Sequence, residues 1–415
     1  MTEKHQMKAQ LPGVSGAGGS PYDAPIRFFT EETGVLACMS VACGTADRAV
    51  RAFGGAADPD GRPVREDSIF DLASLTKLFT GLLLMRLAEQ GRIGLDAPVT
   101  RYVPAFSRLA GLTVRQTAWF ERAVRTPERV DQALSREQAL SCLLDAGVSD
   151  NGPRAYSDMH AMVIKYVLEA AGGLPYMELL KKEILEPLGM GETFCRVPDS
   201  LRSRCVSCDR EHRIERGRYI LRDGVAPGTP HDPKARILNP DGDDCPGHAG
   251  LFSTAGDMVK LCRGILSGQI VSRASLRLMA DNHVGRPLPG GGYSQYLGCL
   301  CYVRHPDQHF SETPAFLSDS AIGLSGFAGN HLALDPETGV FEFYLGSRVM
   351  NRLSVLIPRE GETLRDFGLN EDGTGSVLWP DGERVLSSVQ YVYLKDRHLH
   401  PVTERILREM NTAHA

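Results

Sequence analysis

Residues 68–77 read Ser-Ile-Phe-Asp-Leu-Ala-Ser-Leu-Thr-Lys, and the chain continues through LFTGLLLMRLAEQ to Gly91. Apolar residues occupy nearly every face of the run after Asp71, which predicts a helix buried in the middle of a domain. Its first turn holds Ser74 and Lys77, which form the only S-x-x-K in the chain. Because residues three apart lie on one face of a helix, we expect the lysine amine beside the serine hydroxyl. The serine also meets the positive end of the helix dipole.

This pair of residues suits nucleophilic catalysis. A serine is a weak nucleophile until a neighbouring base takes its proton, and a lysine desolvated in a buried helix can be neutral enough to help. The tetrapeptide alone usually has no function when it lies on a surface helix. On a buried helix, however, a lysine is rare unless its charge is paired or it has a function. We therefore predict Ser74 as the nucleophile and Lys77 as its proton-handling partner.

Both ends of the chain predict strands. The segment 34–55 carries apolar and small residues between turn formers and predicts a hairpin with its turn at Gly44. From residue 296 the pattern changes to strands again, with YLGCLCYV, NHLALDP and VFEFYLGSRV before the helical segment HPVTERILREM. Between these ends, residues 92–279 show mostly helical periods and few strands.

These patterns predict an α/β fold. We expect an antiparallel sheet flanked by helices, built from residues 1–90 and 291–415, which would hold the nucleophile helix. Residues 91–290 would form a mainly helical lobe that carries Tyr156. A ligand cleft is expected at the seam between the two parts.

Composition excludes some classes of function. The formal net charge of −5 and the pI near 6.2 leave no basic surface in bulk for phosphates, so we expect no nucleic-acid partner. No apolar run is long enough to cross a bilayer, and residues 1–20 have no apolar core behind their charges. We expect a cytoplasmic protein without a membrane partner that acts on a small-molecule acyl substrate. Its oligomeric state stays open.

The ten cysteines stand at irregular spacings, which predicts reduced thiols rather than a disulfide framework. Cys205, Cys208 and His212 form a C-x-x-C-x-x-x-H cluster that could supply three zinc ligands. A structural zinc site needs a fourth ligand and usually a second knuckle. We interpret the cluster as two free thiols in a polar connecting loop, and we expect neither a metal nor another cofactor.

The motifs and their context resemble a known family. Residues 68–77, followed by GLLLMRLAEQGRIGLDAPVTRYVP, resemble the active-site helix of class C β-lactamases, their esterase relatives and D-amino-acid peptidases. Residues 156–158, Y-S-D, are similar to that family's Y-x-N or Y-S-x motif, and residues 247–254, GHAGLFST, are similar to a further family run. The resemblance covers roughly residues 65–350. It implies a fold of the serine β-lactamase and penicillin-binding-protein type and a serine hydrolase activity.

The resemblance also implies a role for Tyr156. A phenol whose pKa is lowered by a nearby ammonium can accept the serine proton and return it to the leaving group, so Tyr156 opposite Lys77 would be the general base and acid. Without the S-x-x-K, a structural tyrosine that caps a helix would be the better interpretation. Asp158 stands where the family has asparagine, and its charge would help to hold Lys77 protonated. That charge would shift more of the base role onto Tyr156.

The third family element departs from the usual pattern. It normally reads K-T-G or H-x-G, with its cation facing a substrate carboxylate, whereas this chain has Leu324-Ser325-Gly326. Gly326 would let the strand approach the substrate closely, and the amide of Phe327 would pair with that of Ser74 as an oxyanion hole. Leu324 removes the cationic clamp, which favours a neutral or ester-like group over a carboxylate.

Two further features each have more than one interpretation. Where relatives continue into an H-T-S-G-L run, this chain has Trp119 and Phe120, which would line the cleft rim or belong to the core. His231-Asp232 and His248 suggest a Ser-His-Asp triad, but the chain has no G-x-S-x-G elbow. We interpret His248 as a structural or supporting residue.

The motifs together predict a serine hydrolase that forms an acyl-enzyme on Ser74 from an ester or small amide, similar to the esterases of the family. An acyltransferase would use the same acyl-enzyme with an alcohol or amine acceptor. The same motifs also suit a D-amino-acid peptidase or a β-lactamase, and a non-catalytic acyl-binding sensor would keep the fold without turnover. The presence of Ser74, Lys77 and Tyr156 together argues against the sensor.

Overall fold

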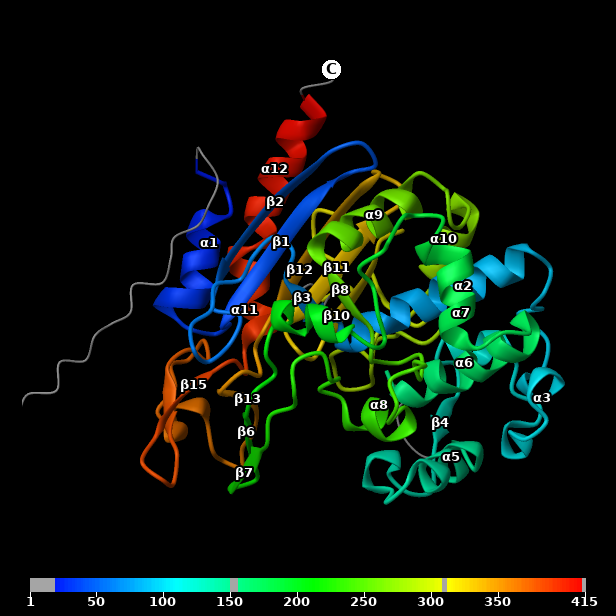
Figure 1. The fold of residues 1–415 in the computed structure, drawn as a ribbon, viewed down its shortest axis with the longest axis horizontal. Coiled ribbons are helices and arrows are strands. Elements are labelled where there is room, and N and C mark those ends of the chain that lie inside the picture. The colour runs from blue at the N-terminus through cyan, green and yellow to red at the C-terminus, as the bar shows by residue number, and fades with distance from the viewer. Residues whose placement is uncertain (1–18, 150–155, 308–311, 413–415) are drawn as a thin grey trace, which may run out of the picture.

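A six-stranded antiparallel sheet forms the centre of the structure, a computed structural model that describes residues 19–149, 156–307 and 312–412 (Figure 1). The strands lie in the order β2-β1-β12-β11-β10-β9. The hairpin near the N-terminus pairs with β12, so both ends of the chain build one sheet, as the sequence predicts. The bounds are β1 Cys38–Thr45, β2 Ala49–Gly55, β9 Tyr302–Val303, β10 Ile322–Gly326, β11 Asn330–Asp335 and β12 Val340–Gly346.

The turn of this first hairpin lies at residues 46–48 rather than at Gly44. Gly44 stays in β1 opposite Ala49. A Cβ at Gly44 would come within 2.1 Å of the Arg48 carbonyl oxygen, so the glycine serves the close approach of the two strands and does not form the turn.

Helices cover both faces of the sheet (Figure 1). Alternate side chains of a strand point to opposite faces. Ala42 and Leu324 accordingly enter one core together with helix α2, whereas Val41 and Tyr344 enter a second core with helices from the two chain ends. The helices at the chain ends are α1 Asp23–Arg27, α11 Tyr391–His398 and α12 His400–Thr412.

The helix that follows Ser74 is buried, as the sequence predicts. This helix, α2, spans Thr76–Glu89, and all its residues from Thr76 to Met85 are buried. Ser74 lies just before it in a short 3-10 turn, Ala73–Leu75. The chain reverses after the helix at Gly91, whose φ is +71°. The predicted nucleophile therefore sits at the N-terminal end of a helix in the core.

Most other helices come from the middle of the chain and pack around α2. Helix α6 packs directly against it, and the Ser157 hydroxyl caps α6 by accepting a hydrogen bond from the Met159 amide at 3.3 Å. This packing brings Tyr156, just before the cap, next to the start of α2. The helices are α3 Val99–Tyr102, α4 Val114–Ala118, α5 Arg136–Leu144, α6 Asp158–Gly172, α7 Tyr176–Leu180, α8 Pro233–Leu238, α9 Ala255–Leu266 and α10 Arg273–Met279.

A second sheet of five strands joins the middle of the chain to its C-terminal part. Its order is β14-β15-β13-β6-β7, and β13 runs parallel to both β6 and β15. Two of its strands, β6 and β7, come from residues 91–290, which the sequence predicts to be mainly helical. The domain boundaries at residues 90 and 290 stay a prediction. The bounds are β6 Glu211–Glu215, β7 Arg218–Arg222, β13 Arg352–Ile357, β14 Ser376–Leu378 and β15 Arg384–Ser387.

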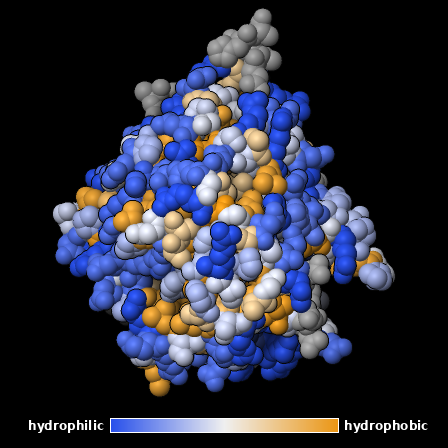
Figure 2. Space-filling view, turned by 90° about the vertical axis from the view of Figure 1, so that its right-hand side faces the viewer, coloured by the Kyte–Doolittle hydropathy of each residue, from blue (hydrophilic) through white to orange (hydrophobic). Residues whose placement is uncertain are grey.

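Two short strand pairs complete the described fold. β3 (Ile69–Asp71) pairs with β8 (Phe252–Thr254), and β4 (Ala123–Arg125) pairs with β5 (Gly147–Ser149). The first pair ties the segment before Ser74 to the GHAGLFST run. Across the described residues, no helix is both long and apolar enough to cross a membrane. Hydrophilic residues dominate the face shown in Figure 2, with small hydrophobic patches between them.

Candidate active site

The turn that carries Ser74 is held by a buried carboxylate. Asp71 accepts hydrogen bonds from the amide of Ala73 at 2.8 Å and from the amide of His231 at 2.7 Å. The side chain of Asn330 donates to the Asp71 carbonyl at 2.8 Å. Burial raises the pKa of Asp71, and the two backbone amides oppose that rise. The turn is therefore fixed from the sheet on one side and from a loop of the middle segment on the other.

The strand β10 approaches this turn through Gly326. A Cβ at Gly326 would meet the Leu72 carbonyl oxygen at 2.6 Å and the Asn330 side-chain nitrogen at 2.7 Å. No side chain fits there without moving the backbone. The glycine thus brings β10 to the nucleophile turn, whereas the sequence predicts a close approach to the substrate.

We expect Gly326→Ala to destabilise the protein by about 1–3 kcal/mol, the usual cost of forcing an extra methyl group into a packed site. The turnover rate should fall as well, because β10 must move away from Ser74. Gly191→Ala is the matched control, since nothing lies within 4 Å of a Cβ at Gly191. Denaturant unfolding of both variants measures the effect. Equal stability of the two variants would show that the close approach at Gly326 is not required.

Lys77 lies in contact with Ser74. Its ammonium donates hydrogen bonds to the Ser74 hydroxyl at 2.9 Å and to the His248 carbonyl at 3.0 Å, and it pairs with Asp158 at 2.7 Å. The lysine side chain is 0% exposed. The structure therefore brings Ser74, Lys77 and Asp158 together as the sequence predicts.

A second ammonium, that of Lys234, shares Asp158 with Lys77. Lys234 lies 3.1 Å from Asp158 and 3.2 Å from Asp232, which in turn lies 3.0 Å from the ring of His248. Burial would raise the pKa of Asp158, but the charges of Lys77, His248 and Lys234 outweigh burial and hold that pKa below its usual range. Asp158 is thus held in its charged form by the positive groups around it.

Sequence reasoning missed Lys234. The signal was the segment Asp232-Pro233-Lys234 at the start of α8, where Asp232 caps the helix by accepting from the Ala235 amide at 2.9 Å. A cap fixes the first helical turn, and it places Lys234 beside Asp232. Nothing in the sequence, however, places this turn next to residues 77 and 158.

Tyr156 lies beside Lys77, but the expected effect on its phenol is wrong. The ammonium lies over the face of the ring, 4.8 Å from its centroid, and not at the hydroxyl. Burial raises the pKa of Tyr156 well above its usual value, the Asp158 charge raises it further, and the nearby Ser74 hydroxyl only partly opposes both. The buried phenol oxygen has no hydrogen-bond partner of good geometry among the described residues. Tyr156 is therefore a neutral phenol in this arrangement.

Aromatic neighbours fix the ring of Tyr156. Phe120 stacks on it at 5.7 Å and Tyr302 at 5.2 Å. The side-chain oxygen of Gln295 accepts a hydrogen bond from the Tyr156 amide at 2.8 Å.

Trp119 and Phe120 are both fully buried, which decides for their core role over a place on the cleft rim.

The third motif lies along β10 with its side chains on different sides. Leu324 is 1% exposed and belongs to the core around α2. Ser325 donates a hydrogen bond to Glu312 at 2.5 Å. Phe327, just after the strand, is 37% exposed, and its amide has no hydrogen-bond acceptor among the described residues. That amide is available for the predicted oxyanion hole.

Phe327 lies between two nitrogen-bearing side chains. The ring of His231 stacks on it at 5.6 Å, and the guanidinium of Arg348 lies 5.3 Å from its centroid. Arg348 also donates to the Ser354 carbonyl, and its Nε is buried without a hydrogen-bond partner among the described residues. Burial lowers the pKa of Arg348 to about 10. Arg348 thus places a cation beside the Phe327 ring, just after the third motif.

The structure contains no Ser-His-Asp arrangement among its described residues. The ring of His231 pairs with Glu211 at 3.3 Å, and that of His248 pairs with Asp232 at 3.0 Å. His248 contacts Lys77 only through its carbonyl oxygen. This is the supporting role that the sequence indicates for His248.

Among the residues that the structure describes, two groups of side chains have the spacing of metal ligands. In the first, Asp158, Asp232 and His248, the ammonium groups of Lys77 and Lys234 already neutralise the carboxylates. The second group is formed by residues of β11, β12 and α12. An ammonium lies beside it as well, because Lys395 is 3.5 Å from the His400 ring nitrogen. Both groups therefore form ion-pair networks. The second group consists of His331, Glu342 and His400.

The cysteines and the C-x-x-C-x-x-x-H segment take no metal arrangement in the described structure. All ten cysteines are free. Cys205 and Cys208 are buried, and the His212 ring packs against Trp379 with 4.6 Å between centroids. The histidine lies in β6 and is occupied by an aromatic contact, and the two thiols are free but buried, whereas the sequence predicts a polar connecting loop.

A serine hydroxyl bonded to a buried lysine, at the start of a core helix beside an antiparallel sheet built from both chain ends, is the arrangement of the penicillin-recognising serine hydrolases. The chain belongs to the Beta-lactamase family, whose model matches residues 27–352. This family of serine hydrolases includes peptidases and esterases.

Comparison with individual proteins agrees with this class. The chain is 27% identical over 224 residues to the D-alanyl-D-alanine-carboxypeptidase/endopeptidase AmpH of Escherichia coli (strain K12), a match that covers 50% of this chain and 52% of AmpH. Its fold is similar to EstCE1, a hydrolase with promiscuous acyltransferase activity, with a TM-score of 0.60 and 20% identity over 78% of this chain and 92% of EstCE1. A penicillin-binding protein homologue from Caulobacter crescentus gives a TM-score of 0.63 and 18% identity over 94% of this chain and 100% of that one.

Proposed function

We propose that this protein hydrolyses an ester or small amide through an acyl-enzyme on Ser74, with a preference for esters. The observation that carries the proposal is the 2.9 Å contact between the Ser74 hydroxyl and an ammonium that is 0% exposed. A buried lysine in contact with a serine is costly for folding and useful for proton transfer.

In this proposal the Lys77 amine is the group that accepts the serine proton. As the Ser74 oxygen attacks the carbonyl carbon, its proton passes to the lysine amine, and Asp158 stabilises the ammonium that forms. Lys234 also pairs with Asp158 and adds a second positive charge beside it. The amides of Ser74 and Phe327 would stabilise the oxyanion.

Tyr156 acts when the leaving group departs, which completes the formation of the acyl-enzyme. Its neutral phenol gives a proton to the leaving oxygen and takes one from the Lys77 ammonium, so the phenol ends the step unchanged. Water then attacks the acyl-enzyme with the same groups used in reverse. A raised phenol pKa suits this role, because the phenol must hold its proton until the leaving group needs it.

The acceptor of the acyl group decides between hydrolysis and acyl transfer. Both reactions use the same acyl-enzyme and differ in whether water or an alcohol attacks it. Product analysis of p-nitrophenyl ester reactions with and without added short alcohols distinguishes the two. Formation of free acid in the presence of alcohol supports the hydrolase, whereas formation of a new ester supports the transferase.

The ten unpaired thiols are in keeping with a reducing compartment, and we place the enzyme in the cytoplasm on that ground.

Leu324 sets the substrate preference in this proposal. We expect the wild type to turn over neutral esters faster than penicillin-like or D-Ala-D-Ala substrates, because the third motif has leucine where relatives have a cation, so a substrate carboxylate would lose its hydration there without gaining a partner. Leu324→His should shift the ratio of kcat/KM toward carboxylate-bearing substrates by about tenfold to a hundredfold, the worth of one charge-assisted hydrogen bond. Steady-state kinetics on both substrate types measures this ratio.

Leu332→His is the matched control for this experiment, since Leu332 pairs with Leu324 on the neighbouring strand and is equally buried. It should destabilise the protein without changing the substrate preference. A wild type that hydrolyses cephalosporins faster than any neutral ester would contradict the prediction, and it would indicate that Arg348 serves the carboxylate.

A further inference from the structure

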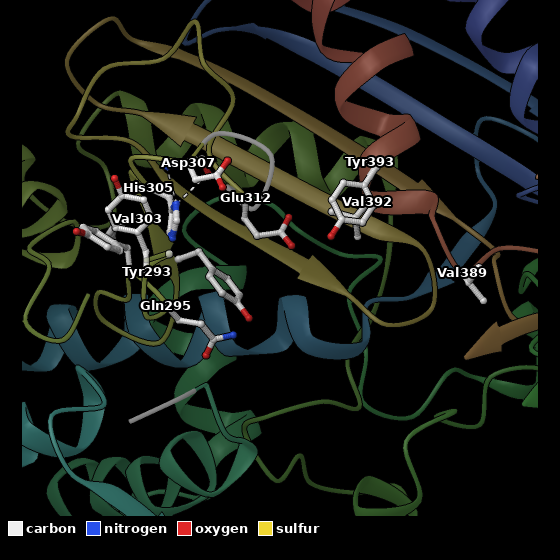
Figure 3. A pocket seen from close by; sticks show the side chains of 12 residues that line it. Tyr293, Gln295, Val303, His305, Asp307, Glu312, Val389, Val392 and Tyr393 are labelled. Atoms are coloured by element: carbon white, nitrogen blue, oxygen red, sulfur yellow. Dashed lines mark hydrogen bonds between the residues drawn. The ribbon is translucent and has the colours of Figure 1, made fainter. Parts of the chain in front are cut away.

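A cavity of about 500 Å³ lies next to the candidate active site (Figure 3). It is formed by residues from the segment around β9, from Glu312 before β10 and from α11. Aromatic and acidic side chains make up much of its lining, which includes Tyr293, Tyr296, Tyr302, Tyr393, Asp307 and Glu312. None of the described residues that line the cavity is lysine or arginine.

The cavity touches both motifs that flank Ser74. Tyr302, which lines it, stacks on Tyr156 at 5.2 Å, and Gln295, which also lines it, holds the Tyr156 amide at 2.8 Å. On the other side, Glu312 accepts a hydrogen bond from Ser325 of the third motif at 2.5 Å. The lining of the cavity therefore borders both Tyr156 and the third motif of the candidate active site.

The described lining of the cavity contains two carboxylates and neither lysine nor arginine. Burial would raise the pKa of Glu312, but Lys395, His331 and Ser325 lower it to about 2, so the carboxylate is charged. Lys395 lies 3.8 Å from Glu312 but closer, at 2.9 Å, to Asp396. Neither Lys395 nor Asp396 lines the cavity, so Glu312 and Asp307 are the two carboxylates of its described lining, and His305 lines it as well.

The aromatic side chains add to this field. The face of a tyrosine ring attracts a cation within about 6 Å of its centroid. Glu312 and Tyr393 both point into the cavity, from the segment before β10 and from α11 respectively (Figure 3). Several tyrosine rings and two carboxylates in one cavity form a site for a positively charged organic group, and they disfavour an anion.

We infer that this cavity, lined by Tyr293, Tyr302, Tyr393, Asp307 and Glu312, binds an ammonium group of the substrate. The substrate class is then an ester or small amide with an amine or quaternary ammonium in its acyl or leaving part. The inference rests on the proposed function for the bond that is broken, but not for the binding of the cation.

Matched substrates test the inference directly. The acetate ester of choline is compared with its neutral isostere 3,3-dimethylbutyl acetate, and a p-nitrophenyl ester whose acyl chain ends in trimethylammonium is compared with one that ends in tert-butyl. The wild type should favour the cationic member of at least one pair by about tenfold or more in kcat/KM, which is the worth of a cation over an aromatic face. Equal rates within both pairs would overturn the inference and leave the proposed function intact.

Variants locate the effect. Tyr393→Leu should abolish the preference by lowering kcat/KM for the cationic ester to that for its neutral partner, and Tyr393→Phe should keep the preference because the ring remains. Asp307→Asn should reduce the preference several-fold. Asp319→Asn is the control for the acidic group, since Asp319 is 95% exposed and does not line the cavity. A preference that survives Tyr393→Leu and Asp307→Asn would contradict this location.

Binding measured without turnover separates this inference from the proposed function. Titration calorimetry with phenyltrimethylammonium should show binding to the wild type and to Ser74→Ala alike, and about tenfold weaker binding to Tyr393→Leu, the worth of one cation–ring contact. If no ester is hydrolysed but the cation binds, the proposed function fails and the cation site stands. If esters are hydrolysed and the cation does not bind, the cation site fails.

Discussion

Ser74→Ala is expected to lower kcat/KM for p-nitrophenyl acetate by about 10⁴-fold or more, because the variant has no nucleophile to form the acyl-enzyme. The fold should be unaffected, since the Ser74 hydroxyl bonds to Lys77 and Lys77 keeps its bonds to Asp158 and His248. Steady-state kinetics and thermal unfolding measure the two effects.

Ser68→Ala is the matched control for this variant. Ser68 is buried in the same stretch of sequence, and its hydroxyl accepts a hydrogen bond from the Arg65 amide at 2.8 Å, away from Lys77. It should lose some stability and keep its activity. A Ser74→Ala protein that retains activity within about tenfold of the wild type would exclude Ser74 as the nucleophile.

Lys77→Met and Tyr156→Phe should each lower kcat/KM by about 10²- to 10⁴-fold, the usual effect of removing a general acid or base. The double variant should lose little more than the worse single one, because the two side chains pass the same proton and fail as a unit. Kinetics on all four proteins of this double-mutant cycle measures the coupling.

The Tyr156→Phe variant tests the hydroxyl alone, since the phenyl ring keeps its stacking between Phe120 and Tyr302. Tyr176→Phe is the matched control, because Tyr176 is also fully buried against α2 but its hydroxyl bonds to Thr80 at 2.8 Å, one helical turn beyond Lys77. Tyr176→Phe should lose some stability and keep near-normal rates on neutral esters. Independent, additive losses in Lys77→Met and Tyr156→Phe would show that the two groups do not share a proton.

The local parts of this structure follow from the sequence. The S-x-x-K sits on an apolar run, and a run that is apolar on nearly every face has to be a core helix, which α2 is. The pairing of β1 with β12 also follows, because β-type segments at the two chain ends have few strand partners between them and must pair with each other. Both predictions rest on the pattern of apolar residues within the individual segments.

The second sheet did not follow from the sequence. β6 (EHRIE) and β7 (RYILR) are short and show no regular alternation of charged and apolar residues, and their register depends on a parallel pairing of β6 with β13 across about 140 residues. Pairing at such a distance leaves no local pattern. The same reason hides Lys234, whose contact with Asp158 joins two segments that only the fold brings together.

The sign of the pKa shift of Tyr156 was also beyond the sequence. It depends on whether the Lys77 ammonium lies at the hydroxyl or over the ring, and on how much of the phenol is buried. The sequence places a lysine near a tyrosine but gives neither quantity. The cavity beside Tyr302 is hidden for the same reason, since its lining comes from segments as distant as residues 293 and 393.

Covalent labelling with a fluorophosphonate tests the central claim, that Ser74 is the acylated residue. The account predicts one adduct per chain by intact-protein mass, located on the peptide that contains Ser74, and no adduct on Ser74→Ala. Ser74 is partly exposed and its hydroxyl is bonded to Lys77, so it is both accessible and activated. An adduct on a different serine of the wild type, or a folded wild type that takes no label, would contradict the account.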